Sequence, residues 1–263
     1  MAAASPWLRD FAGAWVFYSI LPGWPWVRPR FERIARFAPW VGLVIAAIQS
    51  GVWWVLLALG WSSPAAVAVL IAMGLWLTGG LHVDGVMDTA DGLSAGATRR
   101  LEAMEDSRVG ASGVQAFAMV LILQVAALLF LAQRCPNGIP VVLAMAAFWG
   151  RCSPLWAVLR FAYLKVDGTA GFHRAQARGV REICPAGLTV ACTIGAASLA
   201  GLGLDLALTL VVGVFSAVVV AESLGRRLGG HTGDSYGACV VWTETLSLML
   251  LALLAPAWLQ WAG

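Results

Sequence analysis

The sequence predicts an all-α polytopic membrane protein, and three observations carry that prediction: the composition, the long apolar segments and the distribution of lysine and arginine. Of the 263 residues, 60% are hydrophobic and only 12% are charged. Soluble domains are about 45–50% apolar and about 25% charged, so the chain lies well outside that class. The five cysteines show no C-x-x-C pair and no zinc-binding spacing, and we expect them to be small core residues rather than a disulfide framework.

Apolar segments long enough to cross a bilayer recur along the chain, since a spanning helix needs about 20 apolar residues. Before the first of them, residues 6–20 mix apolar, aromatic and polar side chains, which is typical of an interfacial helix. Seven spanning helices are expected, at residues 37–60, 64–81, 112–133, 139–163, 185–204, 207–225 and 238–259. The chain has no long linker or convincing repeat, so residues 1–263 are predicted to form a single domain.

Basic residues gather on one side of the predicted bundle. If residues 1–36 are cytoplasmic, the loops at 82–111, 164–184 and 226–237 lie on the same side, which then holds fourteen of the 17 lysine and arginine residues. The opposite side holds only Arg134. Because cytoplasmic loops carry the excess of basic residues, these loops are predicted to face the cytoplasm. The loop at 164–184 is either a mobile basic lid over an anionic substrate or part of this general excess.

The segment Gly79–Gly92 places His82, Asp84, Asp88 and Asp91 within ten residues, directly after an apolar segment. If the second spanning helix continues through it, the three aspartates share one helical face. Carboxylates this close repel one another unless a cation lies between them, and oxygen ligands of this kind suit Mg²⁺. We therefore predict a Mg²⁺ site at the membrane surface. The alternative is a solvated loop with ordinary acidic residues.

A second acidic pair follows soon after. Glu102 and Asp106 are four residues apart, so one helix would present both on the same face, next to the first cluster. Two such acidic helices are what a two-metal clamp on a pyrophosphate requires. The alternative is local salt bridging with neighbouring arginines. Arg108 is one of these arginines, and it is equally suited to contact a phosphate.

Two further features supply candidate phosphate ligands. Arg151 lies within a predicted span, where a charged side chain is a functional candidate by default; the alternative is snorkelling, or pairing with Glu222 or Glu244. Segment 226–234 can offer backbone N–H groups and guanidinium groups to phosphate oxygens, unless it is only a glycine-rich turn. Its candidate substrate-binding residues are Arg226, Arg227, Gly229, Gly230, Thr232 and Asp234.

The motifs occur in blocks. The first block reads Gly79-Gly80-Leu81-His82-x-Asp84-Gly85-x2-Asp88-Thr89-x-Asp91-Gly92 and is followed by Glu102-x-Met104-x-Asp106-Ser107-Arg108-x-Gly110. The second block is Leu228-Gly229-Gly230-x-Thr232-Gly233-Asp234, and an earlier one is Arg33-x-Ala35-Arg36-x2-Pro39. Over nearly the whole chain these blocks resemble the cobalamin synthase family, also called adenosylcobinamide-GDP ribazoletransferases. Two positions depart from the family pattern, with Ile20 in place of an arginine and Val241 in place of a glutamate.

The resemblance implies an integral membrane, Mg²⁺-dependent enzyme that transfers the adenosylcobinamide phosphoryl group from adenosylcobinamide-GDP to α-ribazole or its 5′-phosphate and releases GMP. The expected location is the bacterial inner membrane, with the active site facing the cytoplasm. The lipid bilayer and these substrates are the expected partners, nucleic acid is not, and the oligomeric state is left open. The predicted metal ligands are Asp84, Asp88, Asp91, Glu102 and Asp106, and either His82 or a carboxylate without metal is expected to accept the hydroxyl proton.

Two other classes of function fit parts of the sequence. A lipid phosphotransferase or an Asp-rich prenyltransferase would also use acidic residues at a membrane surface, and the D-x2-D-G of Asp88–Gly92 is similar to that of CDP-alcohol phosphotransferases. A prenyltransferase is expected to have a second Asp-rich loop, whereas the second block here is rich in glycine and arginine. A transporter would use Arg151, Glu222 and Glu244 as a relay, but most acidic residues concentrate on one side.

Overall fold

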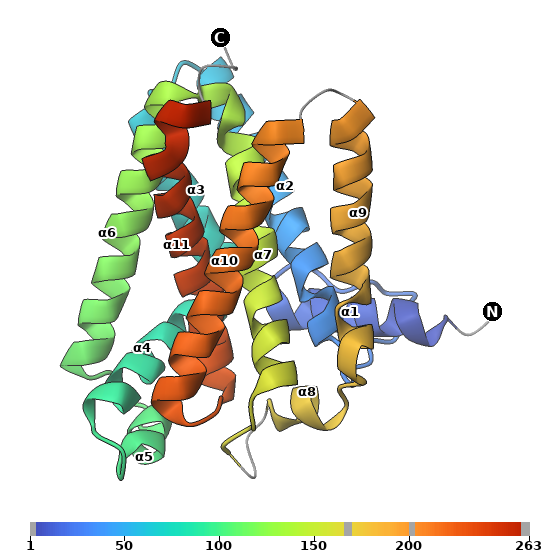
Figure 1. The fold of residues 1–263 in the computed structure, drawn as a ribbon, viewed down its shortest axis with the longest axis vertical. Coiled ribbons are helices and arrows are strands. Elements are labelled where there is room, and N and C mark those ends of the chain that lie inside the picture. Colours follow the sequence, from blue (N-terminus) through green and yellow to red (C-terminus); the bar gives the residue numbers. More distant parts are fainter. Residues whose placement is uncertain (1–3, 166–169, 200–202, 259–263) are drawn as a thin grey trace.

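The chain folds into a bundle of upright helices in a computed structural model that describes residues 4–165, 170–199 and 203–258 (Figure 1). Within these ranges there is one isolated β-bridge and no strand, which confirms the predicted all-α class. All five cysteines are free, but of these only Cys239 is buried, and the expectation of small core residues is wrong for the exposed Cys184 and Cys192. The longer helices are α2 (Ala38–Ala58), α3 (Ser63–Leu77), α6 (Ala111–Arg134), α7 (Ile139–Arg160), α9 (Cys184–Leu199), α10 (Gly203–Leu228) and α11 (Gly233–Trp258).

Five helical segments in the described ranges are long and apolar enough to cross a membrane, and they contain α2, α6, α7, α10 and α11. The count rises to six if α3 and the helix that follows it are taken as one bent span. By itself α3 has 15 residues and α9 has 16, fewer than the about 20 that a straight span needs. The helix in the predicted segment 64–81 is therefore shorter than expected, whereas residues 200–202 of the predicted segment 185–204 lie outside the described residues.

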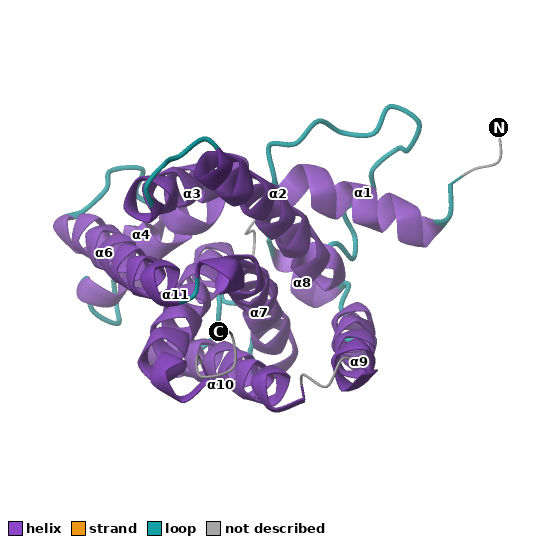
Figure 2. Ribbon diagram, turned by 90° about the horizontal axis from the view of Figure 1, so that it is seen from above, coloured by secondary structure: helices purple, strands orange, loops and turns teal. Residues whose placement is uncertain are grey.

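Helices α7 and α11 form the centre of the bundle. Seen along its axis, they lie between α2, α3, α6 and α10, with α9 at one edge (Figure 2). The apolar stretches of both are 61% buried, compared with 28% for α6. Small residues allow the close packing that stabilises helix pairs in membranes. At Gly150 of α7, for example, a β-carbon would lie 2.6 Å from the side chain of Glu244 on α11.

The chain turns sharply between α3 and α4 (Leu81–Ser94), whose axes differ in direction by 84°. Gly79 and Gly80 have φ angles of 60° and 74°, a left-handed conformation that glycine adopts without steric cost. Their N–H groups donate to the carbonyls of Trp76 and Leu75, which is the Schellman arrangement that ends helices. The second span therefore does not continue straight through the acidic segment, which was one possibility that the sequence left open. The acidic segment forms its own helix at the end of the bundle.

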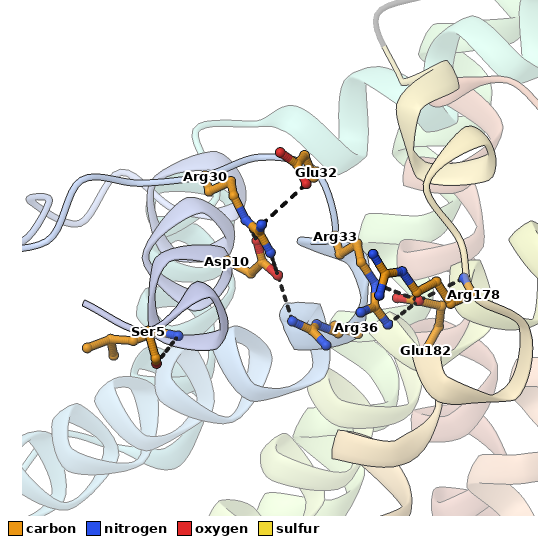
Figure 3. A network of polar contacts seen from close by, with 9 residues as sticks. Ser5, Asp10, Arg30, Glu32, Arg33, Arg36, Arg178 and Glu182 are labelled. Carbon is orange, nitrogen blue, oxygen red and sulfur yellow. Dashed lines mark hydrogen bonds and ion pairs between the residues drawn. The ribbon is translucent and has the colours of Figure 1, made fainter. Parts of the chain in front are cut away.

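The N-terminal segment is joined to this end of the bundle by buried ion pairs (Figure 3). Helix α1 (Pro6–Tyr18) carries Asp10, whose buried carboxylate lies 2.6 Å from Arg30 and 2.6 Å from Arg36. Arg33 pairs with the buried Glu182 at 2.6 Å. Three of the four arginines in residues 26–36 are thus engaged within the protein. The short helix α8 (Gly171–Ala175) is joined to α7 by a hydrogen bond from Arg174 to the carbonyl of Val158, and α1 and α8 both contribute residues to the site.

Candidate functional site

The three aspartates of α4 share one face of the helix, but the protein uses them differently. Both carboxylate oxygens of Asp91 accept backbone hydrogen bonds, from Gly110 at 2.7 Å and from Gly113 at 2.9 Å. These N–H groups belong to the first turn of α6, where they have no partner within the helix. An anion there is also favoured by the helix dipole. Asp91 therefore caps α6, and its predicted role as a metal ligand is untested.

Asp234, at the start of α11, joins Asp84 and Asp88 because α4 and α11 cross at very short range. A β-carbon on Gly85 would overlap the carbonyl oxygen of Asp234, so only glycine permits this approach. Burial is the main cause that raises the pKa of the half-buried Asp88 to about 6, and the negative charges of Asp84 and Asp234 raise it further. We call Asp84, Asp88 and Asp234 the aspartate cluster. It combines residues from both predicted blocks.

Lys165 is the cation that contacts this cluster, with its amino group 3.0 Å from Asp234 and 3.7 Å from Glu105. It is placed there by backbone pairing between two loops, in which Leu164 donates to His231 at 2.8 Å and His231 donates to Ala162 at 2.9 Å. In the sequence, Lys165 is one of several basic residues of the loop at 164–184, which was interpreted either as a lid or as part of the general basic excess. Its pairing with Asp234 depends on two segments almost 70 residues apart, for which the sequence contains no local signal.

Glu102 and Asp106 do not form the predicted second acidic face. Helix α5 (Arg100–Glu105) ends one residue before Asp106, so the two side chains are not on one helix. Asp106 hydrogen-bonds Arg108 at 2.7 Å, which lowers the pKa of that carboxyl to about 2, and the exposed Glu102 lies 3.4 Å from Arg99. The structure thus shows the local salt bridges that were the alternative. The predicted roles of both residues as metal ligands stay predictions.

Segment 226–234, called here the glycine-arginine segment, has an exposed part and a buried part. Arg226 and Arg227 lie in the last turn of α10 and are exposed, and Arg226 pairs with Glu222 at 3.0 Å. Neither arginine lines the cavity beside the aspartate cluster, whereas Asp234 does. Thr232 is buried and accepts a hydrogen bond from the backbone of Ser235 at 3.2 Å, which caps α11. Of the flexible glycines, Gly229 is exposed and Gly230 is buried.

A cavity of about 140 Å³ opens between α1, α4, α7, α8 and α11, and Asp84 and Asp234 line it together with aromatic and imidazole rings. Tyr18 lies between two histidines, with ring centres 6.3 Å from His82 and 6.4 Å from His173 and nearly parallel planes. Burial lowers the pKa of His82 to about 3 and that of His173 to about 4. Both rings are therefore neutral at physiological pH.

Arg151 is buried in the middle of α7, where its guanidinium group lies 2.8 Å from Glu244 of α11. This confirms pairing with Glu244, one of the two alternatives for Arg151, while Glu222 instead pairs with Arg226 at the bundle end. Arg151 lines both the cavity described above and a second one of about 90 Å³ deeper in the bundle. Because Arg151 lines the cavity, a substrate bound there can reach it. The contact itself stays a prediction.

Carboxylate oxygens are the ligands that Mg²⁺ prefers, and the aspartate cluster supplies them. Within residues 4–165, 170–199 and 203–258, no three His, Cys, Asp or Glu side chains converge closely enough to form a complete metal site by themselves. The aspartate cluster is thus a group of carboxylates whose charges influence one another, with Lys165 in contact, and not a closed cage. Mg²⁺ typically keeps several waters and binds through one or two carboxylates plus substrate phosphates, so an open site of this kind suits it.

Comparison with known proteins identifies the family. The model of a family described as cobalamin-5-phosphate synthase matches residues 10–252. The chain belongs to this family. Its members are enzymes of cobalamin synthesis, so the resemblance found in the sequence motifs is confirmed, and with it the assignment of the chain as an enzyme.

Curated relatives match over almost the entire length. A protein of Prochlorococcus marinus strain MIT 9313 is 54% identical over 258 residues, which cover 95% of this chain and 98% of the relative. A protein of Thermosynechococcus vestitus is 42% identical over 92% of this chain and 95% of the relative. Both are named adenosylcobinamide-GDP ribazoletransferase. No solved structure matches the chain.

Proposed function

We propose that the chain transfers the adenosylcobinamide phosphoryl group from adenosylcobinamide-GDP to α-ribazole or its 5′-phosphate, with Mg²⁺ as cofactor and GMP as the second product. The names of the curated relatives support this reaction. The observation that carries the proposal is the aspartate cluster, which combines three carboxylates from two helices, and two of them, Asp84 and Asp234, line one cavity. Such a group suits a reaction in which a pyrophosphate must be bound and its charge neutralised.

The chemistry of the donor set fits Mg²⁺, because the cluster contains three carboxylates and Lys165 is the cation in contact with it. Asp84, Asp88 and Asp234 would hold the ion; Asp91 is the weaker candidate because both its oxygens already accept hydrogen bonds. When bound, the ion offsets the negative charge that develops on the phosphate oxygens.

In the proposed step, a ribazole hydroxyl oxygen forms a bond to the phosphorus next to cobinamide. The bond between this phosphorus and the bridging oxygen breaks, and GMP leaves with that oxygen. Lys165, 3.0 Å from Asp234, is placed to stabilise the charge on the leaving phosphate. The hydroxyl proton goes to a carboxylate of the cluster or to His82, whose Nδ1 has no partner among the described residues. Arg108, Arg226 and Arg227 are exposed at the same end and are secondary candidates for nucleotide phosphates.

We further propose that this site faces the cytoplasm from the bacterial inner membrane. The end of the bundle that carries the aspartate cluster also carries most of the basic residues, while Arg134 lies at the other end. Positive charge on this side favours a cytoplasmic orientation. Labelling of single cysteines at the two ends, in intact cells with a membrane-impermeant reagent, distinguishes the two orientations.

The reaction can be tested with purified protein in detergent or nanodiscs. Adenosylcobinamide-GDP and α-ribazole, with and without its 5′-phosphate, are incubated with and without Mg²⁺, and the corrinoid product and GMP are quantified by chromatography. We expect corrinoid product and GMP in equal amounts and only when Mg²⁺ is present. Absence of a corrinoid product under every condition would contradict the proposal, and product formation in a chelator would contradict the role of the ion.

A further inference from the structure

The cavity of about 140 Å³ contains polar atoms that the protein leaves without partners. Nδ1 of His82, Nε of Arg151, Nδ1 of His173 and the hydroxyl of Tyr236 have no hydrogen-bond partner among the described residues. All four side chains are more than nine-tenths buried, and all four line this cavity. Buried polar groups are nearly always hydrogen-bonded. Four unpaired groups around one cavity therefore indicate that a polar ligand binds there.

The size and the lining of the cavity restrict what this ligand is. An apolar cavity of about 150 Å³ is known to take up benzene, so this cavity of about 140 Å³ has room for an aromatic ring, with the rest of the molecule lying outside it. Part of its wall is apolar, with Pro154, Val158 and Val240. Phe17, Tyr18 and Tyr236 add aromatic side chains to the same wall, against which an aromatic ligand can pack.

The position of the cavity connects the ligand to the reaction. Asp84 and Asp234 line the same cavity as the buried rings, so a substituent on a bound ring points toward the aspartate cluster. In the proposed reaction the acceptor α-ribazole has this form, since it is a riboside of dimethylbenzimidazole and reacts through a sugar hydroxyl. A base in the cavity would place that hydroxyl beside the phosphates.

The hydrogen-bonding groups favour benzimidazole over guanine, the other fused aromatic ring in the reaction. The hydroxyl of Tyr18 lies 3.4 Å from Nε2 of His173. In the tautomer that accepts from Tyr18, the neutral His173 ring carries its proton on Nδ1, the atom without a partner. A glycosylated benzimidazole has one free ring nitrogen, which is an acceptor, and its remaining edge is apolar. Guanine instead has several donors and acceptors, and the apolar wall of the cavity would leave some of them unpaired.

We propose that this cavity is the base site for the acceptor, in which Nδ1–H of His173 donates to the free ring nitrogen of the benzimidazole and the apolar and aromatic wall packs against the ring system. The inference rests on the proposed function and names the residues that select its acceptor. His173 is a positioning residue here, because it contacts the base and not the reacting hydroxyl.

Two substitutions at His173 separate this role from a structural one. His173→Asn places an amide N–H near the position of Nδ1 but loses the contact with Tyr18, whereas His173→Gln reaches the position of Nε2 and loses the donor at Nδ1. Each variant is assayed with benzimidazole riboside and with indole riboside, which has a C–H in place of the free ring nitrogen. One net hydrogen bond corresponds to roughly a 5- to 10-fold effect.

We expect the wild type and His173→Asn to prefer benzimidazole riboside over indole riboside by roughly 5- to 10-fold in kcat/KM, and His173→Gln to lose that preference. The KM for adenosylcobinamide-GDP should be unchanged in both variants. An unchanged preference in His173→Gln, or a rise in the KM of the GDP substrate instead, would overturn the base site while the proposed function stands. Absence of product from the wild type with every acceptor would overturn the proposed function and the base site together.

Discussion

Two groups of carboxylates lie at the same end of the bundle, and they differ in how their charge is compensated. Asp106 pairs with Arg108 and Glu102 with Arg99, each with its own arginine on an exposed segment. In the aspartate cluster, Asp88 is half-buried and faces the charges of Asp84 and Asp234, with one lysine in contact. Exposed pairs of the first kind contribute little to stability. The aspartate cluster has more negative charge than its single lysine compensates, and two packed helices hold it together. A bound cation would stabilise such a group.

The largest expected effect separates the two groups directly. Asp88→Asn removes one charge from the cluster while keeping the size of the side chain, and the loss of a metal ligand is expected to lower product formation by roughly 10³-fold. Asp106→Asn is the matched control, with an expected change of less than about 3-fold. Initial rates of GMP release and unfolding temperatures in detergent check this. A folded Asp88→Asn protein with nearly full activity would refute the role of the cluster.

The next effect separates Asp91 from its neighbours on α4. Because Asp91 caps α6 with two charge-assisted hydrogen bonds, Asp91→Ala is expected to destabilise the protein by about 2–3 kcal/mol. Heating in detergent, with detection of the remaining folded protein, should show this loss. The Mg²⁺ concentration for half-maximal activity of the surviving folded protein should change little. A large rise in that concentration, with normal stability, would instead make Asp91 a metal ligand.

A third prediction tests whether the crossing of α4 and α11 holds the cluster together. Gly85→Ala adds a β-carbon against the carbonyl of Asp234, and such overpacking is expected to destabilise by about 1–3 kcal/mol and to lower activity as well. Gly51→Ala in α2 is the control, since no atom lies within 4 Å of a β-carbon there. It should be neutral or slightly stabilising. Equal behaviour of the two variants would argue against a sterically fixed crossing.

The smallest expected effect compares two cations near the site. Lys165 contacts Asp234 at 3.0 Å, whereas Arg226 pairs with Glu222 outside the cavity. Lys165→Gln is expected to lower kcat/KM for adenosylcobinamide-GDP by roughly 10-fold, as for the loss of one charged hydrogen bond. Arg226→Gln should lower it by less than about 2-fold. A larger loss of kcat/KM in Arg226→Gln than in Lys165→Gln would instead assign phosphate binding to the glycine-arginine segment.

The fold class and most of the spans could be predicted from the sequence because hydropathy is a local property. The predicted segment 112–133 nearly coincides with α6, for instance. The bend after α3 was also encoded locally, by the adjacent glycines Gly79 and Gly80, but their φ angles depend on the helix end that they cap. For that reason the sequence alone does not show whether the acidic segment continues the second span or forms a separate helix.

The membership of the site depends on contacts between distant segments, which the sequence does not display. The role of Asp91 follows from the return of the chain to the start of α6, and that of Lys165 from the backbone pairing with His231. Spacing alone could not distinguish Asp88 from Asp91, since both lie on the same helical face. His173 and Tyr18 likewise come from segments 155 residues apart, and the buried pair of Arg33 with Glu182 helps to hold these segments together.

The central claim is that Asp234 of α11 completes the Mg²⁺ site that Asp84 and Asp88 begin on α4. The most direct measurement is the Mg²⁺ concentration that gives half-maximal product formation in Asp234→Asn and in the control Asp106→Asn. The account predicts a rise of at least roughly 10-fold for Asp234→Asn, because perturbed metal sites typically lose 10- to 100-fold in affinity, and no change for Asp106→Asn. An unchanged Mg²⁺ requirement in folded Asp234→Asn protein would contradict it, and so would an equal rise in Asp106→Asn.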